Sequence, residues 1–175
     1  MNIDLIAQMK TSMEFFEAYH DGDEKRLYQG KGLIFYALSN TNMNARYEIS
    51  NFLLDKGADV TGITPNGSTA LHVLLGHVKH DAKATVELCK RLIDCGADVG
   101  VLDKDNISIM QNIVNIGIHE NELESLYDML FAQPNLDFTS KNFRGFSPMD
   151  LAIKRGTRPK LIERMREYNP SGGHR

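Results

Sequence analysis

The stretch Asn66-Gly-Ser-Thr-Ala-Leu-His72 decides how this chain folds. Two further stretches follow the same pattern, Asp105-Asn-Ile-Ser-Ile-Met-Gln111 and Arg144-Gly-Phe-Ser-Pro-Met-Asp150. Their hydroxyl residues Thr69, Ser108 and Ser147 are separated by 39 residues each time. A fixed period of this size indicates a stack of similar structural units, and such stacks usually present a surface to a partner.

Each unit is predicted to contain two short helices. In the clearest unit, Gly67 suits a tight turn, and Thr69 is a natural cap for a helix that runs to about Leu75. After a polar loop, a second helix is indicated by residues with helical spacing, namely Thr85, Leu88, Cys89, Leu92 and Ile93. This helix is expected to end at Gly96, because glycine readily adopts the left-handed conformation found there. A helix pair this short cannot bury its own apolar face, so each unit needs its neighbour.

These motifs resemble the ankyrin repeat. The resemblance rests on Thr69-Ala-Leu-His72 with Gly96-Ala-Asp-Val99, and on Gly57-Ala-Asp-Val60 and Gly145-Phe-Ser-Pro-Met-Asp-Leu-Ala152. It covers about residues 30–168 and is closest to small, stand-alone bacterial proteins of this type. It implies an all-α solenoid of helix-turn-helix units joined by β-hairpin-like loops. It also implies that His72 bridges backbone groups of adjacent turns.

The expected organisation is an N-terminal helical cap followed by four units. Residues 1–29 are assigned to the cap, which is a degenerate repeat with Leu5, Met9, Met13 and Phe16 on one side. The four repeats are placed at 30–60, 61–99, 100–138 and 139–168, and the last of them serves as the C-terminal cap. Residues 169–175 are expected to form a flexible tail.

The composition is that of an ordinary soluble, folded protein, with 42% hydrophobic and 25% charged residues. The chain begins without a signal-peptide pattern and contains no apolar run long enough to span a membrane. We therefore expect a cytoplasmic protein that does not bind membranes. Cys89 and Cys95 are expected to be reduced thiols, because their spacing suits neither a disulfide nor a metal-binding pair.

Charge is distributed unevenly along the chain. Residues 98–137 contain eight acidic residues and one lysine, whereas residues 139–168 contain eight basic and three acidic residues. Such an uneven field steers association more than it stabilises a fold. The basic block is interpreted as a solvated face or a docking site for an acidic protein. Nucleic acid is not the expected partner, because a recognised motif is missing and the acidic block would repel phosphates.

The sequence predicts no catalytic residue, no metal site and no cofactor, so the protein is not expected to be an enzyme. His77 and His80 are three residues apart, but they lack a third ligand with suitable spacing. A nucleic-acid-binding or metal-dependent activity is retained as a less favoured alternative.

The partner-binding surface is predicted around the last hairpin. Twelve residues separate Gln133 from Gly145, against ten between Gly57 and Gly67, so this hairpin is expected to protrude further than the others. Tyr36 and Ile116 are expected as solvent-facing apolar residues near the inner helix ends. The candidate binding residues are Lys104, Asp105, Ile107, Phe143, Arg144, Phe146, Lys154 and Arg155. For Ile107 and Phe146 a second interpretation stays open, in which they seal adjacent hairpins together.

The resemblance implies non-catalytic binding of another protein through the hairpin tips and the inner helix face. Some bacterial ankyrin proteins are the cytoplasmic immunity partners of secreted toxins, so the sharpest hypothesis is an immunity protein that occludes a toxin domain. The alternative is a general cytoplasmic adaptor or regulator. We expect the protein to be a monomer on its own.

Overall fold

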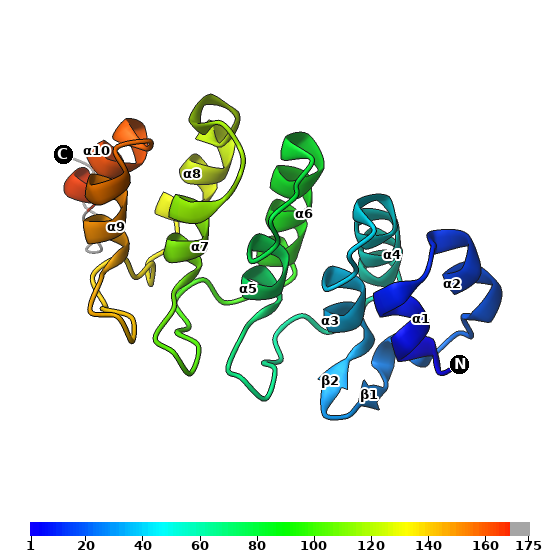
Figure 1. Cartoon of the computed structure of the whole chain (residues 1–175). Coiled ribbons are helices and arrows are strands. Elements are labelled where there is room, and N and C mark those ends of the chain that lie inside the picture. The colour runs from blue at the N-terminus through cyan, green and yellow to red at the C-terminus, as the bar shows by residue number, and fades with distance from the viewer. Residues whose placement is uncertain (169–175) are drawn as a thin grey trace.

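In the computed structural model, pairs of helices stack side by side along an elongated solenoid (Figure 1). The structure describes residues 1–168, and the predicted tail at 169–175 lies outside them. We call the helix that follows each hairpin the inner helix; these are α3 (Leu33–Leu38), α5 (Ala70–Leu75), α7 (Ile109–Asn115) and α9 (Pro148–Arg155). The outer helices are α4 (Met43–Asp55), α6 (Ala82–Asp94), α8 (Glu124–Phe131) and α10 (Pro159–Glu167), with a 3₁₀ turn, η2 (Glu120–Glu122), before α8.

The N-terminal cap contains α1 (Ile3–Met9), α2 (Ser12–Ala18) and the 3₁₀ turn η1 (Asp23–Lys25). A two-stranded antiparallel hairpin follows, formed by β1 (Leu27–Tyr28) and β2 (Lys31–Gly32). Helix α1 packs against α3, and α2 packs against α4. The apolar residues expected on one side of the cap face solvent, with exposed fractions from 37% to 69% for Leu5, Met9, Met13 and Phe16.

The inner helices α5 and α9 begin at the hydroxyl residues that recur every 39 positions. The Thr69 side chain accepts a hydrogen bond from the His72 amide, and the His72 ring accepts one from the Thr69 amide at 3.2 Å. Ser147 and Asp150 form the same reciprocal pair at the start of α9. Each pair satisfies two amide groups that have no partner within the helix.

The start of α7 departs from this pattern. Ser108 makes no cap, and its buried hydroxyl has no hydrogen-bond partner. Three residues further on, the Gln111 side chain extends to the next unit and donates to the Phe146 carbonyl at 3.1 Å. The glutamine therefore makes a contact between units in place of the local cap.

The outer helices α4 and α6 end at Gly57 and Gly96, whose φ angles are +79° and +99°. In both, the amide of the following residue bonds to the carbonyl five positions earlier at 2.9 Å, an ending that glycine favours. Three aspartates spaced 39 residues apart then fix the direction of the chain. Asp59, Asp98 and Asp137 each accept a hydrogen bond from the amide two residues later.

Four hairpins project from the same side of the solenoid (Figure 1). We call them finger 1 (27–32), finger 2 (64–68), finger 3 (103–107) and finger 4 (142–146). Fingers 2 to 4 share one hydrogen-bond pattern, in which the first amide bonds to the fifth carbonyl and the fourth amide to the first carbonyl, at 2.8–3.1 Å. The fourth residue has a positive φ in all three, and it is Gly67, Asn106 or Gly145.

The expectation that finger 4 protrudes further than the others was wrong. Fingers 2, 3 and 4 have the same length and occur at the same 39-residue spacing as the aspartates. Gln133 was taken as the counterpart of Gly57 and Gly96, but Asp137 occupies the position of Asp59 and Asp98, which places that counterpart at Asn135. The two extra residues therefore belong to the turn after α8 and do not lengthen the finger.

Buried polar side chains also join neighbouring units away from the fingers. Arg158 is only 5% exposed, and its guanidinium donates to the carbonyls of Ile118 at 2.7 Å and Ile116 at 2.5 Å. One side chain thus supplies hydrogen-bond donors to the loop between α7 and α8. The last unit is thereby attached to the one before it.

We predict that Arg158→Ala lowers the free energy of unfolding by about 2–4 kcal/mol, because two buried carbonyls lose their donor. Urea denaturation monitored by circular dichroism measures this change. Arg155→Ala is the matched control: Arg155 is exposed, and its loss should change stability by less than about 0.5 kcal/mol. Equal stability of the two variants would contradict the assigned role of Arg158.

Candidate functional site

Hydrogen bonds between successive fingers align their tips. The Lys104 amide donates to the Asn66 carbonyl at 3.0 Å, and the Phe143 amide donates to the Asp105 carbonyl at 3.1 Å. We call this series the finger ladder, since each step joins one finger to the next. The Lys104 ammonium group reinforces its step by donating to the Asn66 side chain at 2.8 Å.

Side chains of the inner helices α5 and α7 also hold fingers 3 and 4 in place. His72 Nε2 donates to the Ile107 carbonyl at 2.9 Å, and this confirms the bridging role expected for this histidine. Gln111 makes the equivalent bond to the Phe146 carbonyl. Fingers 3 and 4 are therefore held both by the finger before them and by the inner helix before them.

Finger 4 is also ordered internally by Asn142. Its side-chain oxygen accepts the Arg144 amide at 2.9 Å and the Phe146 amide at 3.2 Å. Its side-chain nitrogen lies 3.4 Å from the Gln111 amide oxygen. The backbone of the finger is thus fixed before any partner arrives, which lowers the entropic cost of binding.

The ring of Phe143 is 65% exposed on this ordered tip. The Arg144 guanidinium lies 5.1 Å from the ring centroid, so the aromatic face and the cation form one unit. An exposed aromatic ring beside an arginine is typical of residues that contribute most to binding energy.

The other predicted binding residues divide into two groups. Asp105, Lys154 and Arg155 are exposed on finger 3 and α9. Ile107 and Phe146 are half-buried, and the Lys154 ammonium lies 4.7 Å from the centroid of the Phe146 ring. The carbonyls of these two residues accept hydrogen bonds from the inner-helix side chains of His72 and Gln111.

The acidic and basic blocks of the sequence partly neutralise one another. Arg164 pairs with Asp128 at 2.6 Å, and Lys160 pairs with Glu124, both between α10 and α8. Within residues 139–168, the exposed cations without an ion-pair partner are Lys141, Arg144, Lys154, Arg155 and Arg166. Four of these five cations lie on finger 4, on the segment leading to it and on α9, and Arg166 lies on α10.

Several exposed apolar residues were not among the predicted binding residues. Ile153 on α9 is 54% exposed, Leu27 on finger 1 is 72% exposed, and Ile63 just before finger 2 is 54% exposed. Each is an ordinary aliphatic residue, and no motif marks it as exposed. Conversely, Tyr36 and Ile116 are only 3% and 5% exposed, so the expectation that they face solvent was wrong.

The reason for the burial of Tyr36 is visible in the cap, where its hydroxyl donates to the Tyr28 carbonyl at 2.7 Å. Ile116 is covered because its own carbonyl receives the buried Arg158 guanidinium. Both residues therefore contribute to the contacts between units and are unavailable to a partner.

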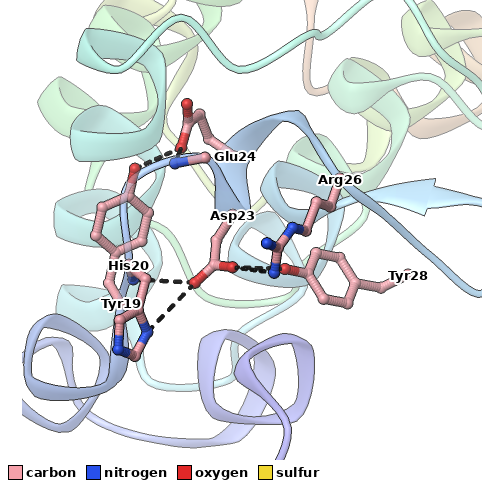
Figure 2. Close-up of polar contacts among 7 residues, drawn as sticks. Tyr19, His20, Asp23, Glu24, Arg26 and Tyr28 are labelled. Carbon is pink, nitrogen blue, oxygen red and sulfur yellow. Dashed lines mark hydrogen bonds and ion pairs between the residues drawn. The ribbon is translucent and has the colours of Figure 1, made fainter.

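The cap contains a second polar cluster, shown in Figure 2. Asp23 accepts hydrogen bonds from the Arg26 guanidinium at 3.1 Å, the Tyr28 hydroxyl at 3.2 Å and the His20 amide at 3.0 Å. Glu24 accepts the Tyr19 hydroxyl, and this bond lowers the pKa of the Glu24 carboxyl. Both carboxylates are buried and hydrogen-bonded, so they stabilise the turn that leads into finger 1.

His77 and His80 form hydrogen bonds within the protein. His77 Nε2 donates to the Leu38 carbonyl at 2.8 Å. His80 Nε2 donates to the His77 carbonyl at 2.8 Å, and its Nδ1 lies 3.1 Å from the Thr85 hydroxyl. Burial lowers the pKa of both rings, although the hydrogen bonds to the Leu38 and His77 carbonyls act in the opposite direction. Within residues 1–168, histidine, cysteine, aspartate and glutamate do not gather in groups of three that could hold a metal ion.

The two cysteines are separate and unpaired: Cys89 is buried in the core, and Cys95 is exposed at the end of α6. Burial raises the pKa of the Cys89 thiol to about 12, so this thiol is inert at neutral pH. None of the helices within residues 1–168 is both long and apolar enough to cross a membrane.

Comparisons with known proteins agree with this geometry. The family model of the ankyrin repeat matches residues 66–104. A crystal structure of a functionally unknown protein from Leptotrichia buccalis C-1013-b is 31% identical in sequence, with a TM-score of 0.84 over 95% of this chain and 92% of that chain. No curated protein matches the chain.

We predict that stability falls as the pH is lowered from 7.5 to 5.5. Burial lowers the pKa of His72, His77 and His80 below 6.5, and the Arg46 cation lowers the last two further. Protons therefore bind the unfolded chain near pH 6.5, while the folded chain keeps neutral rings. Urea midpoints measured across this range test the prediction.

The double variant His77→Gln/His80→Gln should lose less stability than the original protein between pH 7.5 and 5.5. The control His119→Gln changes an exposed histidine and should leave the pH dependence as in the original protein. A urea midpoint that stays constant from pH 7.5 to 5.5 would disprove the neutral buried state.

Proposed function

Because the chain belongs to the ankyrin repeat family, whose repeats are protein–protein interaction modules, we propose that it binds a partner protein through fingers 3 and 4 and helix α9. The proposed contact residues are Lys104, Asp105, Ile107, Phe143, Arg144, Phe146, Lys154 and Arg155. The proposed activity is non-catalytic occlusion of the partner's surface.

The single observation that carries this proposal is the exposed ring of Phe143 on a rigid finger. Phe143 is 65% exposed, and an aromatic residue beside an arginine is the kind of pair that carries much of the energy of protein–protein binding. The Phe143 amide is bonded to finger 3, and Arg144 stacks on the ring, so the pair is already arranged for binding. Binding then loses little conformational entropy, and most of the burial of the ring contributes to affinity.

The charge of the proposed binding surface indicates which class of partner fits it. The exposed cations at finger 4 and on α9, namely Lys141, Arg144, Lys154 and Arg155, complement an acidic surface. In the sharper form of the proposal, the partner is an acidic face of a bacterial toxin domain, and the protein is its cytoplasmic immunity partner. The competing form is a cytoplasmic adaptor or regulator with a partner of its own cell. In both forms the protein is a monomer before it binds.

We predict that Phe143→Ala weakens partner binding by about 30-fold, because truncation of a central aromatic contact costs about 2 kcal/mol or more. Arg144→Glu should slow association and reduce its dependence on salt, since it reverses a steering charge. Interferometry measures the affinity and the association rate of each variant. The ligand is the protein encoded by the neighbouring gene, purified separately.

Two exposed residues outside the fingers and α9 provide matched controls. Val78→Ala truncates an apolar side chain that is 87% exposed, and Lys83→Glu reverses a charge that is 85% exposed. Neither should change the affinity by more than about twofold. If Phe143→Ala and Arg144→Glu bind as well as these controls do, the proposed face is the wrong one.

The immunity form has its own readout, namely growth of cells that express the neighbouring protein. Co-expression of this chain should restore growth, and the Phe143→Ala variant should restore it only in part. A neighbouring protein that binds tightly but is harmless to cells would favour the adaptor form instead.

A further inference from the structure

The junction between fingers 1 and 2 lacks both contacts that hold the later fingers together. In the 39-residue register, Pro65 occupies the position of Lys104 and Phe143, whose amides form the finger ladder. Proline has no amide hydrogen, so this step cannot form. Among residues 1–168, hydrogen bonds join finger 2 to finger 3 and finger 3 to finger 4, but none joins finger 1 to finger 2.

The hydrogen bond from an inner-helix side chain to the next finger is also missing at this junction. Phe35 is the third residue of α3, as His72 is of α5 and Gln111 is of α7. A phenyl ring has no donor, so it cannot bond to the Ser68 carbonyl as His72 bonds to the Ile107 carbonyl. Two independent substitutions thus leave the same junction without hydrogen bonds.

A pocket of about 90 Å³ lies at this junction. Its apolar wall includes Phe35, Leu27 and Ile63, and the last two are 72% and 54% exposed. The volume is smaller than the roughly 150 Å³ of an apolar cavity that holds benzene, so the pocket suits one aliphatic side chain. Leu27 and Ile63 are exposed and unpaired apolar groups beside it, as expected of the rim of a docking site.

Glycines line the pocket from finger 1, at Gly30 and Gly32, and from the segment just before finger 2, at Gly62. A Cβ atom at Gly62 would contact only the Phe35 ring, at 3.8 Å and 4.0 Å. Because glycine has no side chain, the backbone of an extended segment can approach the wall closely. The shape therefore favours a peptide in an extended conformation over a bulky folded surface.

The charges that face solvent at this site are mainly positive. The pocket is lined by Lys25, Arg26 and Lys31, and the Lys31 ammonium lies 4.2 Å from the centroid of the Tyr36 ring. The neighbouring carboxylates of Asp23 and Glu24 are buried and bonded to the groups drawn in Figure 2. Of the acidic residues lining the pocket, Asp59 is exposed, and its carboxylate caps the Thr61 amide.

We propose that the pocket between fingers 1 and 2 receives one aliphatic side chain from an extended, acidic segment of a partner protein. The proposal rests on the proposed protein-binding function and adds a second contact at the opposite end of the finger row from Phe143. Lys25 and Lys31 pair with acidic residues that flank the aliphatic one. Leu27 on finger 1 and Ile63 just before finger 2 cover that side chain.

The probe is the blocked synthetic peptide Glu-Asp-Leu-Asp-Glu, titrated into the uniformly ¹⁵N-labelled full chain. We expect saturable changes of the amide resonances of Gly30, Gly32, Gly62 and Ile63. The companion peptides Glu-Asp-Gly-Asp-Glu and Lys-Lys-Leu-Lys-Lys should bind at least about tenfold more weakly, since they lack the aliphatic group or the acidic charge. Absence of saturable changes, or equal binding of the three peptides, overturns the proposal.

Variants test the same site from the protein side. Gly62→Val fills the pocket without backbone strain, because Gly62 does not have a positive φ. This variant should bind the peptide Glu-Asp-Leu-Asp-Glu at least about tenfold more weakly. The double variant Lys25→Glu/Lys31→Glu should lower the affinity for this peptide to a similar degree. Circular dichroism melting should show that both variants remain folded. Folded variants that bind the peptide as strongly as the original protein overturn the proposal.

Phe143→Ala separates this inference from the proposed function. It should leave peptide binding at the pocket unchanged while it weakens capture of the neighbouring protein. If the peptide fails to bind but Phe143→Ala still weakens partner capture, the pocket proposal fails alone. If the peptide binds in the pocket and Phe143→Ala has no effect on the partner, the assignment to fingers 3 and 4 fails instead.

Discussion

The hydrogen bonds between one unit and the finger that follows it are the constraint on which the rest of the structure depends. Each finger lacks a core of its own, so its position is set by its neighbours. His72 and Gln111 supply the side-chain contact to fingers 3 and 4, and the amides of Lys104 and Phe143 supply the main-chain contact. From finger 2 to finger 4, the 39-residue period keeps donors and acceptors opposite one another.

The same constraint connects the scaffold to binding. An isolated two-residue or three-residue turn is flexible and would lose much entropy on binding a partner. Finger 4 avoids that cost, because Asn142, Gln111 and finger 3 fix its backbone through hydrogen bonds. The exposed ring of Phe143 can then act as a rigid anchor. Stability and recognition therefore depend on the same few contacts.

The sequence predicted the architecture well because its local signals are periodic and chemically specific, as with the Thr69 cap, the glycines that end α4 and α6, and the bridging His72. It failed where a position of the repeat holds another residue type. Asn135 occupies the register position of Gly57 and Gly96 without their positive φ, so Gln133 was taken as their counterpart and finger 4 was expected to protrude. Burial of Tyr36 and exposure of Leu27 depend on packing between units, which no local pattern encodes.

The finger row is therefore not uniform, and the difference between its ends has a functional consequence. At fingers 3 and 4 the hydrogen bonds between units are formed, and Phe143 and Arg144 lie exposed beyond them. At fingers 1 and 2, Pro65 and Phe35 lack the donors, and a pocket lined by apolar and charged residues lies at this junction. In this way a repeat protein can form a binding site by omitting hydrogen bonds between two neighbouring fingers, without inserting additional residues. A partner that reaches both ends would gain affinity from two weak contacts held at a fixed separation by the rigid stack of units between them.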